Sequence, residues 1–240
     1  MVKIAGLTRQ YIQVKRKGKD SITFGGDQGF FKGAPETAED EKKRSIGCGI
    51  VAFSDLLLYL AGKDPGYQIQ DNRSYVNRIL SEEEYKSYFN SQYAFFGGFS
   101  KRRNKGLSGF GLKRGFNRRA RSEKWKLRAI WGWSSAKLFD RIKEMLEKDI
   151  PVILCVPMMI FKKDRGKGIT FYKKEGHLFH KVCIVSEHYV VITEILREKE
   201  STFIGISSWG EKYYIDWNEY EELIHTHFLG TILGNILYIR

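Results

Sequence analysis

The chain lacks the features that mark exported or membrane-spanning proteins. No apolar run reaches the about 18 residues that a transmembrane helix needs, and the opening sequence MVKIAGLTRQYIQVKRKGK carries charges too early and too often for a signal peptide. No linker, repeat or low-complexity tract interrupts the 240 residues. We therefore expect a cytoplasmic protein that folds as a single domain over residues 1–240, with a helical lobe over about 1–150 and a β lobe over about 151–240.

Cysteine is also scarce. The three cysteines, Cys48, Cys155 and Cys183, are an odd number and show no CxxC spacing. This favours a reducing compartment and argues against a disulfide framework. Cys155 in VILCVP and Cys183 in KVCIVS have apolar neighbours on both sides, so we expect both to be buried in the core.

Acidic residues are nearly missing from one segment. The formal net charge is +13, and residues 101–128 hold twelve Lys and Arg residues against the single acid Glu123, a balance of +11. Three interpretations remain open, namely a solvated face, a nucleic-acid site and a surface for an acidic polypeptide. Helical spacing predicts that part of the segment is an amphipathic helix whose aromatic residues face the core, and we favour a basic surface that lines or flanks a cleft. The residues with that spacing are Phe110, Leu112, Phe116 and Ala120.

The first half of the chain carries helical patterns. Residues 49–61 are apolar on nearly every side and predict a buried helix. Ser81 followed by Glu84 predicts a capping box that opens a second helix through about Phe95. Residues 135–148 show one apolar face at helical spacing and predict a third helix.

After Pro151 the pattern changes to short β-branched and aromatic runs, separated by charged or glycine-containing turns. The runs are PVILCVPMMI, HYVVITEIL, STFIGISSW and KYYIDW. A helical lobe followed by an antiparallel sheet predicts an α+β chain, with a cleft where the two meet.

Cys48 differs from the other cysteines because it lies between Gly47 and Gly49 at the start of the helix predicted over 49–61. The free N–H groups and the positive dipole end of a helix N-terminus favour thiolate over thiol. Neither glycine has a Cβ, so a substrate backbone can approach the sulfur closely. Cys48 is therefore a candidate nucleophile that still needs a base.

His188 is the candidate base because it opens the predicted strand HYVVITEI. A hairpin from this strand to STFIGIS can place Ser207 beside His188, where its hydroxyl would orient the imidazole. Trp209 follows two residues later and can cover that hydrogen bond and exclude water from it.

The remaining histidines form two close pairs, His177 with His180 and His225 with His227. Each pair is a rival base or metal-ligand pair, but no cysteine or acid lies beside it at a metal-site spacing. We expect exposed or capping histidines. The sequence therefore predicts no metal and no other cofactor.

The order of Cys48, His188 and the SSWG run resembles the papain-like cysteine peptidase superfamily, in which the last element usually reads Asn-Ser-Trp-Gly. The runs GCGIVAFSDLLLYL and HYVVIT look closer to its bacterial branch related to bacteriocin-leader peptidases, and above all to a clostridial-type group. That group also has a Gly-Gly-(Asn/Asp)-Gln element upstream of the cysteine, and residues 25–28 here are Gly-Gly-Asp-Gln. The resemblance spans about residues 22–240 through four short elements.

The resemblance implies a papain-like α+β fold in which an N-terminal helical lobe packs against a C-terminal antiparallel sheet. It implies Cys48 as nucleophile, His188 as general base, Ser207 as the histidine-orienting residue and Gln28 as oxyanion donor. The expected reaction is hydrolysis of a peptide or isopeptide bond in a peptide or protein substrate, including an acidic one. Amidase and acyl-transfer reactions use the same groups.

One departure from the superfamily keeps a second function open. Ser207 stands where the superfamily has Asn or Asp, and a hydroxyl stabilises an imidazolium less well than either. The alternative is a nucleic-acid-binding or acidic-partner-binding protein on the same fold that is catalytically weak or inactive, with residues 101–128 as its binding surface.

Overall fold

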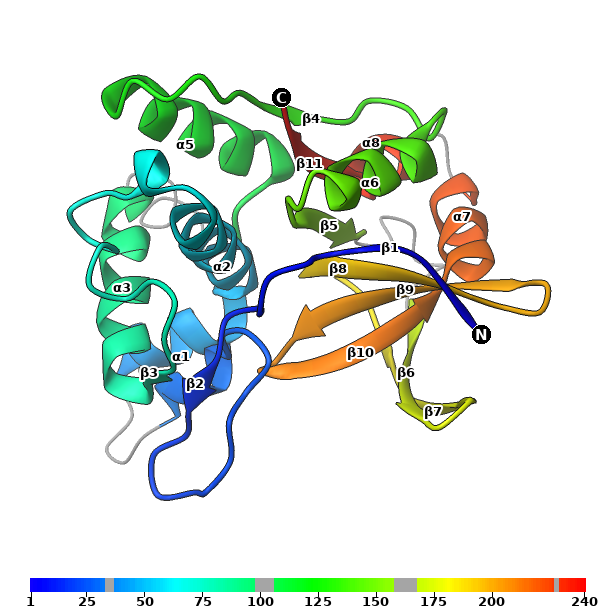
Figure 1. Ribbon diagram of the computed structural model, residues 1–240, viewed down its shortest axis with the longest axis horizontal. Coiled ribbons are helices and arrows are strands. Elements are labelled where there is room, and N and C mark those ends of the chain that lie inside the picture. Colours follow the sequence, from blue (N-terminus) through cyan, green and yellow to red (C-terminus); the bar gives the residue numbers. More distant parts are fainter. Residues whose placement is uncertain (33–36, 98–105, 158–167, 227–228) are drawn as a thin grey trace. The chain divides into compact units, whose positions relative to one another are not determined.

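The computed structural model is an α+β chain with helices mainly in its first half and strands mainly in its second (Figure 1). It describes residues 1–32, 37–97, 106–157, 168–226 and 229–240. These residues divide into two units, each described by itself below. The sheet unit comprises residues 1–8, 130–207 and 212–240, and the helical unit comprises residues 9–129 and 208–211. The division differs from the expected one near residue 150, because the N-terminal strand and residues 130–150 belong with the sheet.

The helical unit is built around α2 (Cys48–Lys63), which confirms the buried helix predicted over 49–61. Twelve of its 16 residues are buried, so the helix has almost no solvent face and lies in the core. It contacts α1, α3 and the 3-10 helix η2. The other elements of the unit are η1 (Gln28–Phe31), α1 (Ala38–Ile46), η2 (Pro65–Tyr67), α3 (Glu82–Phe95), α5 (Gly109–Ser122) and the parallel strands β2 (Val14–Lys15) and β3 (Leu80–Ser81).

The capping box predicted at the start of α3 is confirmed. The Ser81 hydroxyl accepts a hydrogen bond from the Glu84 backbone N–H at 3.2 Å, and the Glu84 carboxylate accepts one from the Ser81 N–H at 2.7 Å. Arg78 also donates to both Glu84 carboxylate oxygens, and this pair together with the Ser81 N–H lowers the pKa of Glu84 to about 2. The helix ends at Phe95, as predicted.

The sheet unit contains one sheet of nine strands among the described residues (Figure 1). Its order is β4-β11-β5-β8-β9-β10-β6-β7, and β1 pairs with β8 beyond the end of β5. The pairs of β8 with β5 and β9 are antiparallel, as predicted, and β8 also forms an antiparallel pair with β1, a strand that was not predicted from the sequence. The strands are β1 (Val2–Gly6), β4 (Ala129–Trp131), β5 (Val152–Val156), β6 (Ile169–Glu175), β7 (Leu178–Val185), β8 (His188–Glu198), β9 (Ser201–Ser208), β10 (Glu211–Asp216) and β11 (Ile236–Ile239).

Among the described residues, the sheet unit has three helices. Helix α6 (Leu138–Glu147) confirms the helix predicted over 135–148, and it packs on β1, β5, β8 and β11. Helix α7 (Trp217–His225) contacts β6 and the short α8 (Gly230–Leu233). The sheet therefore gains its apolar cover from segments that follow or precede its strands directly in sequence.

The expectation that Cys155 and Cys183 are buried in the core is wrong for both. Each thiol-bearing residue is only partly buried. Cys183 lies on β7, the last strand in the sheet order, where side chains on either side of it are solvent-exposed: Val182 is 50% and Ile184 is 60% exposed. An apolar run on a strand at the sheet margin has no second layer to bury it, and the sequence pattern does not distinguish it from a central strand. The tail of the predicted strand PVILCVPMMI, residues 158–160, lies outside the described residues.

None of the described helices is by itself both long enough and apolar enough to cross a bilayer. Helices α1 and α2 taken together would be long enough and apolar enough to cross a bilayer, but the chain bends by 72° between them.

Candidate functional site

Cys48 is the first residue of α2, as the sequence predicts. Gly47 precedes it as the N-cap, and the backbone N–H groups of Ile50 and Val51 both donate to the Gly47 carbonyl at 2.9 Å. The side chain is half-buried, and the first turn of the helix carries no acid. The thiol thus lies at the positive end of a four-turn helix dipole.

Gly47 has a structural reason to be glycine that the sequence does not show. A Cβ at this position would collide with the Lys43 carbonyl oxygen at the end of α1 and would press on the ring of Phe89. Gly49 is buried within the first turn of α2. The absence of a side chain at Gly47 is therefore explained by the sharp joint between α1 and α2, without any need for substrate access.

The Gly25–Gln28 segment is anchored to the same helix by a buried carboxylate, Asp55. Its oxygens accept hydrogen bonds from the Gly26 N–H at 3.0 Å, from the Tyr85 hydroxyl at 2.7 Å and from the Tyr11 hydroxyl at 3.1 Å. Burial raises the pKa of Asp55 to about 6, although the three donated hydrogen bonds act in the opposite direction. A carboxylate with only neutral donors around it is costly to bury, which points to a definite positional role.

The anchor lies close to Cys48 along the helix. Asp55 follows Cys48 by seven residues, which is two turns, so the two side chains leave α2 on the same face about 10 Å apart along the axis. Gln28 is two residues from Gly26, and two residues of extended chain span at most about 7 Å. The candidate oxyanion donor is thereby tethered to the helix face that carries the thiol.

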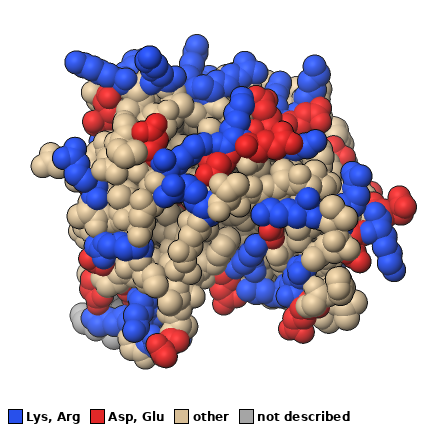
Figure 2. Space-filling model, in the orientation of Figure 1, with Lys and Arg blue, Asp and Glu red and all other residues tan. Residues whose placement is uncertain are grey.

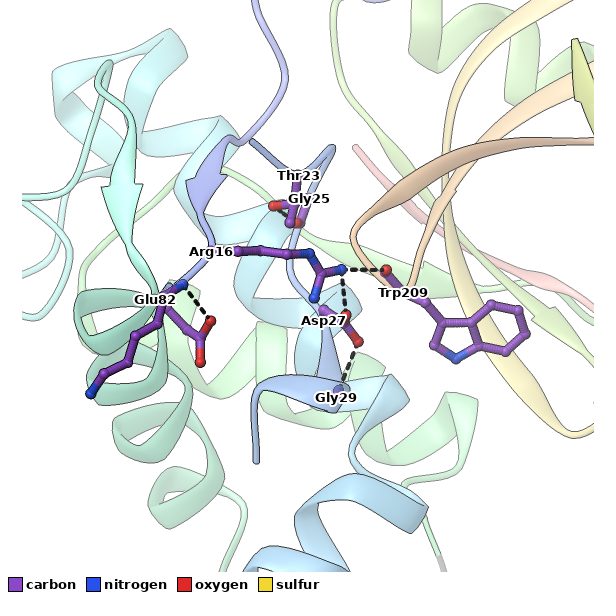
Figure 3. Close-up of polar contacts among 8 residues, drawn as sticks. Arg16, Thr23, Gly25, Asp27, Gly29, Glu82 and Trp209 are labelled. Atoms are coloured by element: carbon purple, nitrogen blue, oxygen red, sulfur yellow. Dashed lines mark hydrogen bonds and ion pairs between the residues drawn. The ribbon is translucent and has the colours of Figure 1, made fainter. Parts of the chain in front are cut away.

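An arginine clamps the residue next to Gln28 (Figure 3). Arg16 Nη2 donates to the Asp27 carboxylate at 2.8 Å and to the Trp209 carbonyl oxygen at 3.4 Å. The Arg16 guanidinium also lies 5.4 Å from the centre of the Phe30 ring. Asp27 in turn accepts from the Gly29 N–H at 2.7 Å and so caps η1, which begins at Gln28. The backbone around Gln28 is therefore fixed from both sides.

Trp209 and Gly210 form the turn between β9 and β10, and both have positive φ angles, 50° and 71°. This turn, residues 208–211, belongs to the helical unit, where the Gly210 N–H donates to the Gly26 carbonyl at 3.0 Å and the Gly210 carbonyl accepts from the Phe24 N–H at 2.8 Å. Figure 3 shows the Trp209 carbonyl facing Arg16 while the indole points away from it. The Trp-Gly pair thus holds the Gly25–Gln28 segment through its backbone, a role that the sequence does not indicate.

His188 is the first residue of β8, as predicted, and it lies in the sheet unit opposite Val156 of β5. Only 7% of its surface is exposed. Burial lowers the pKa of the imidazole to about 4. The ring is therefore neutral at pH 7, which is the form that accepts a proton.

The hairpin predicted between β8 and β9 is confirmed, but its register does not place Ser207 beside His188. Ser207 is paired with Val191, three residues from His188, and because side chains alternate along a strand the two point to opposite faces of the sheet. A bulge between Ile192 and Glu194 is the cause, because without it Ser207 would face Ile192 and share the face of His188. Ser208, the last residue of β9, is 5% exposed.

Two of the other histidines, His225 and His180, make local contacts. His225 lies with one ring nitrogen 2.9 Å from the Ser135 hydroxyl and the other 2.7 Å from the Glu221 carbonyl oxygen. His180 lies 3.7 Å from the exposed Glu175 carboxylate, and His227 is outside the described residues. Within the described part of the chain no group of three or more His, Cys, Asp or Glu residues is arranged to hold a metal ion.

Asp55 and Arg16 are the two site residues that sequence reasoning missed. Asp55 did leave a signal, because it is the only charged residue in the apolar run GIVAFSDLLLYL, where a carboxylate must be buried with partners. The sequence gives no such indication for Arg16, because Arg16 lies in a run of lysines and arginines that is typical of an exposed loop.

Comparison of the chain with known proteins found no matching family model, curated protein or solved structure.

Proposed function

We propose that this chain is a papain-like cysteine peptidase or amidase with Cys48 as nucleophile and His188 as base. The observation that carries the proposal is the position of Cys48 at the first turn of the buried helix α2, on the face to which Asp55 ties the Gly25–Gln28 segment. A thiol, a helix N-terminus and a fixed amide-bearing segment are the parts that acyl transfer needs.

In the proposed reaction, His188 accepts the thiol proton and the Cys48 sulfur attacks the carbonyl carbon of the substrate amide. The Cys48 backbone N–H and the Gln28 side-chain amide donate to the oxyanion of the tetrahedral intermediate. The protonated His188 then gives its proton to the leaving amine, and water attacks the thioester to release the acid. Arg16 and Asp27 hold the backbone of Gln28 during both steps.

The proposal is tested by alkylation of the native chain with iodoacetamide, with the rate at each cysteine followed by peptide mass spectrometry. Cys155 and Cys183 serve as internal controls, since each is partly buried and lies on a strand. We expect Cys48 to react at least tenfold faster than either, because a thiolate is the reactive form. The advantage should disappear in His188→Gln and persist in His177→Gln.

Equal rates at Cys48 in the native chain and in urea, or an unchanged rate in His188→Gln, would contradict the proposal. Ser207→Ala is a further variant. Because the strand register places Ser207 on the opposite face of the sheet from His188, we expect Ser207→Ala to leave the Cys48 rate unchanged.

A further inference from the structure

The exposed surface of α5 carries a line of arginines that the proposed peptidase chemistry does not use. Phe110, Arg114, Arg118 and Arg121 are all solvent-exposed and follow one another at intervals of four, four and three residues. At 100° per residue they lie within about 80° of each other around the helix, and they extend for about 16 Å along it. We call these four residues the basic stripe.

The charge of the stripe is not offset locally. Residues 106–129 hold eight Lys and Arg residues and one acid, Glu123, whose ion pair in the described structure is to Arg119 at 4.0 Å, off the stripe. Beyond the helix the chain adds exposed Lys124, Lys126 and Arg128. Figure 2 shows Lys and Arg side chains gathered along the upper left edge, over α5. Such a concentration of one sign attracts polyanions.

The apolar face of α5 is already occupied, so this helix cannot insert into a bilayer through that face. Leu112 and Phe116 are fully buried and Ala120 is 3% exposed, all on the core side of the helix. A helix that lies in a membrane interface needs that face free for the lipid. Phe110 is the one aromatic residue left on the outer face, 36% exposed, and it corrects the expectation that all aromatic residues of this helix point inward.

The middle arginine of the stripe is held in place. The Arg118 guanidinium stacks over the Phe95 ring with its carbon 3.9 Å from the ring centre, and it donates to the Phe95 carbonyl at 2.6 Å. A planar guanidinium binds phosphate through two parallel N–H groups, and an arginine already ordered loses less entropy on binding. An exposed aromatic ring in the same line provides a surface on which a base can stack.

We infer that the basic stripe binds the phosphate backbone of single-stranded nucleic acid, with Phe110 stacking against a base. Arginine charges alone would also suit an acidic polypeptide. The aromatic residue in line with them favours nucleic acid, because acidic side chains gain nothing from stacking. The contacts are to phosphate and to a base face, so binding is insensitive to sequence.

The test is fluorescence anisotropy of a fluorescein-labelled 20-nucleotide oligothymidylate with the full chain, from 25 to 250 mM NaCl. The stripe variant, Arg114→Gln/Arg121→Gln/Lys124→Gln, removes two arginines of the basic stripe and the exposed lysine that follows α5. The control, Lys15→Gln/Lys17→Gln/Lys19→Gln, removes the same charge from exposed positions at the end of β2 and just after it. We expect the stripe variant to lose at least tenfold in affinity at 50 mM NaCl. Its salt slope should fall by about 2, at roughly 0.7 per lost phosphate contact. Equal losses in both variants would overturn the inference.

Two further measurements test whether Phe110 stacks on a base and whether the partner is a nucleic acid or an acidic polypeptide. Phe110→Leu should bind about fivefold more weakly than wild type while Phe110→Tyr binds equally, since only an aromatic face stacks on a base. Circular dichroism and thermal unfolding check that each variant is folded. Competition by poly-glutamate as effective as that by unlabelled oligothymidylate, at equal charge concentration, would assign the stripe to an acidic polypeptide and overturn the inference.

Discussion

At the residue scale, Gly26 is the tightest point of the segment that carries Gln28. A Cβ at this position would overlap the Tyr85 hydroxyl, which is itself hydrogen-bonded to Asp55. We expect Gly26→Ala to destabilise the helical unit by about 1–3 kcal/mol, because the buried hydroxyl has no room to retreat. Urea unfolding followed by far-ultraviolet circular dichroism measures the loss.

Gly97→Ala is the matched control for this prediction, since a Cβ there meets nothing within 4 Å. The Cβ would also overlap the Cζ and Cε1 ring atoms of Tyr85, so the double variant Gly26→Ala/Tyr85→Leu, which removes the ring with the hydroxyl, should lose less than the sum of the two single losses. Strict additivity would show that the Tyr85 side chain is not what restricts Gly26.

At the element scale, the capping box of α3 makes a prediction of its own. Ser81→Ala removes the acceptor for the Glu84 N–H and should lower the free energy of unfolding by about 1 kcal/mol. Ser45→Ala on the exposed side of α1 is the control and should change it far less. The same urea experiment reports both, and an equal loss in the two variants would contradict a specific capping role.

Element types could be predicted from sequence because each depends on a local period. The buried helix, the capping box and the described parts of the runs after Pro151 were found where the pattern placed them. Phe110 was misplaced because it is two residues before Leu112, which is off the buried face of α5. Ser207 was predicted to lie on the same face of the sheet as His188. One extra residue in β8, at the bulge between Ile192 and Glu194, moves it to the opposite face, and no local sequence pattern predicts a bulge.

The candidate site could be predicted only in part, because only some of its features depend on local sequence. Cys48 at a helix start follows from local sequence, as does His188 at a strand start. The bond from Asp55 to Gly26 joins residues 29 positions apart, and Arg16 meets the Trp209 carbonyl across 193 positions. Contacts of that separation are decided by packing of the whole chain, and one sequence contains no direct record of them.

At the scale of the whole molecule, two buried groups titrate in opposite directions. The native pKa of His188 is about 4 against 6.5 for a free imidazole, so the unfolded chain binds an extra proton between these values and stability rises with pH. The native pKa of Asp55 is about 6 against 3.8, so the folded chain binds the extra proton and stability falls with pH. Between pH 4 and 6 the two contributions nearly cancel.

Single substitutions should therefore reveal opposite slopes. Relative to wild type, the free energy of unfolding of Asp55→Asn should rise with pH from 4 to 6, and that of His188→Gln should fall, each by up to about 1.4 kcal/mol per pH unit. Urea unfolding at half-unit pH intervals measures this, with His180→Gln on the exposed face of β7 as control. Variant curves that run parallel to the wild-type curve would refute the opposed titration.

The Trp209–Gly210 turn has a consequence for dissecting the protein. A fragment that stops at residue 129 would hold every helix of the helical unit, yet the Gly26 carbonyl and Arg16 would lose the backbone partners that Gly210 and Trp209 supply from far downstream. Truncation at this apparent boundary would yield an incomplete module. Adding a short synthetic peptide that spans the missing turn is the natural way to restore it by complementation.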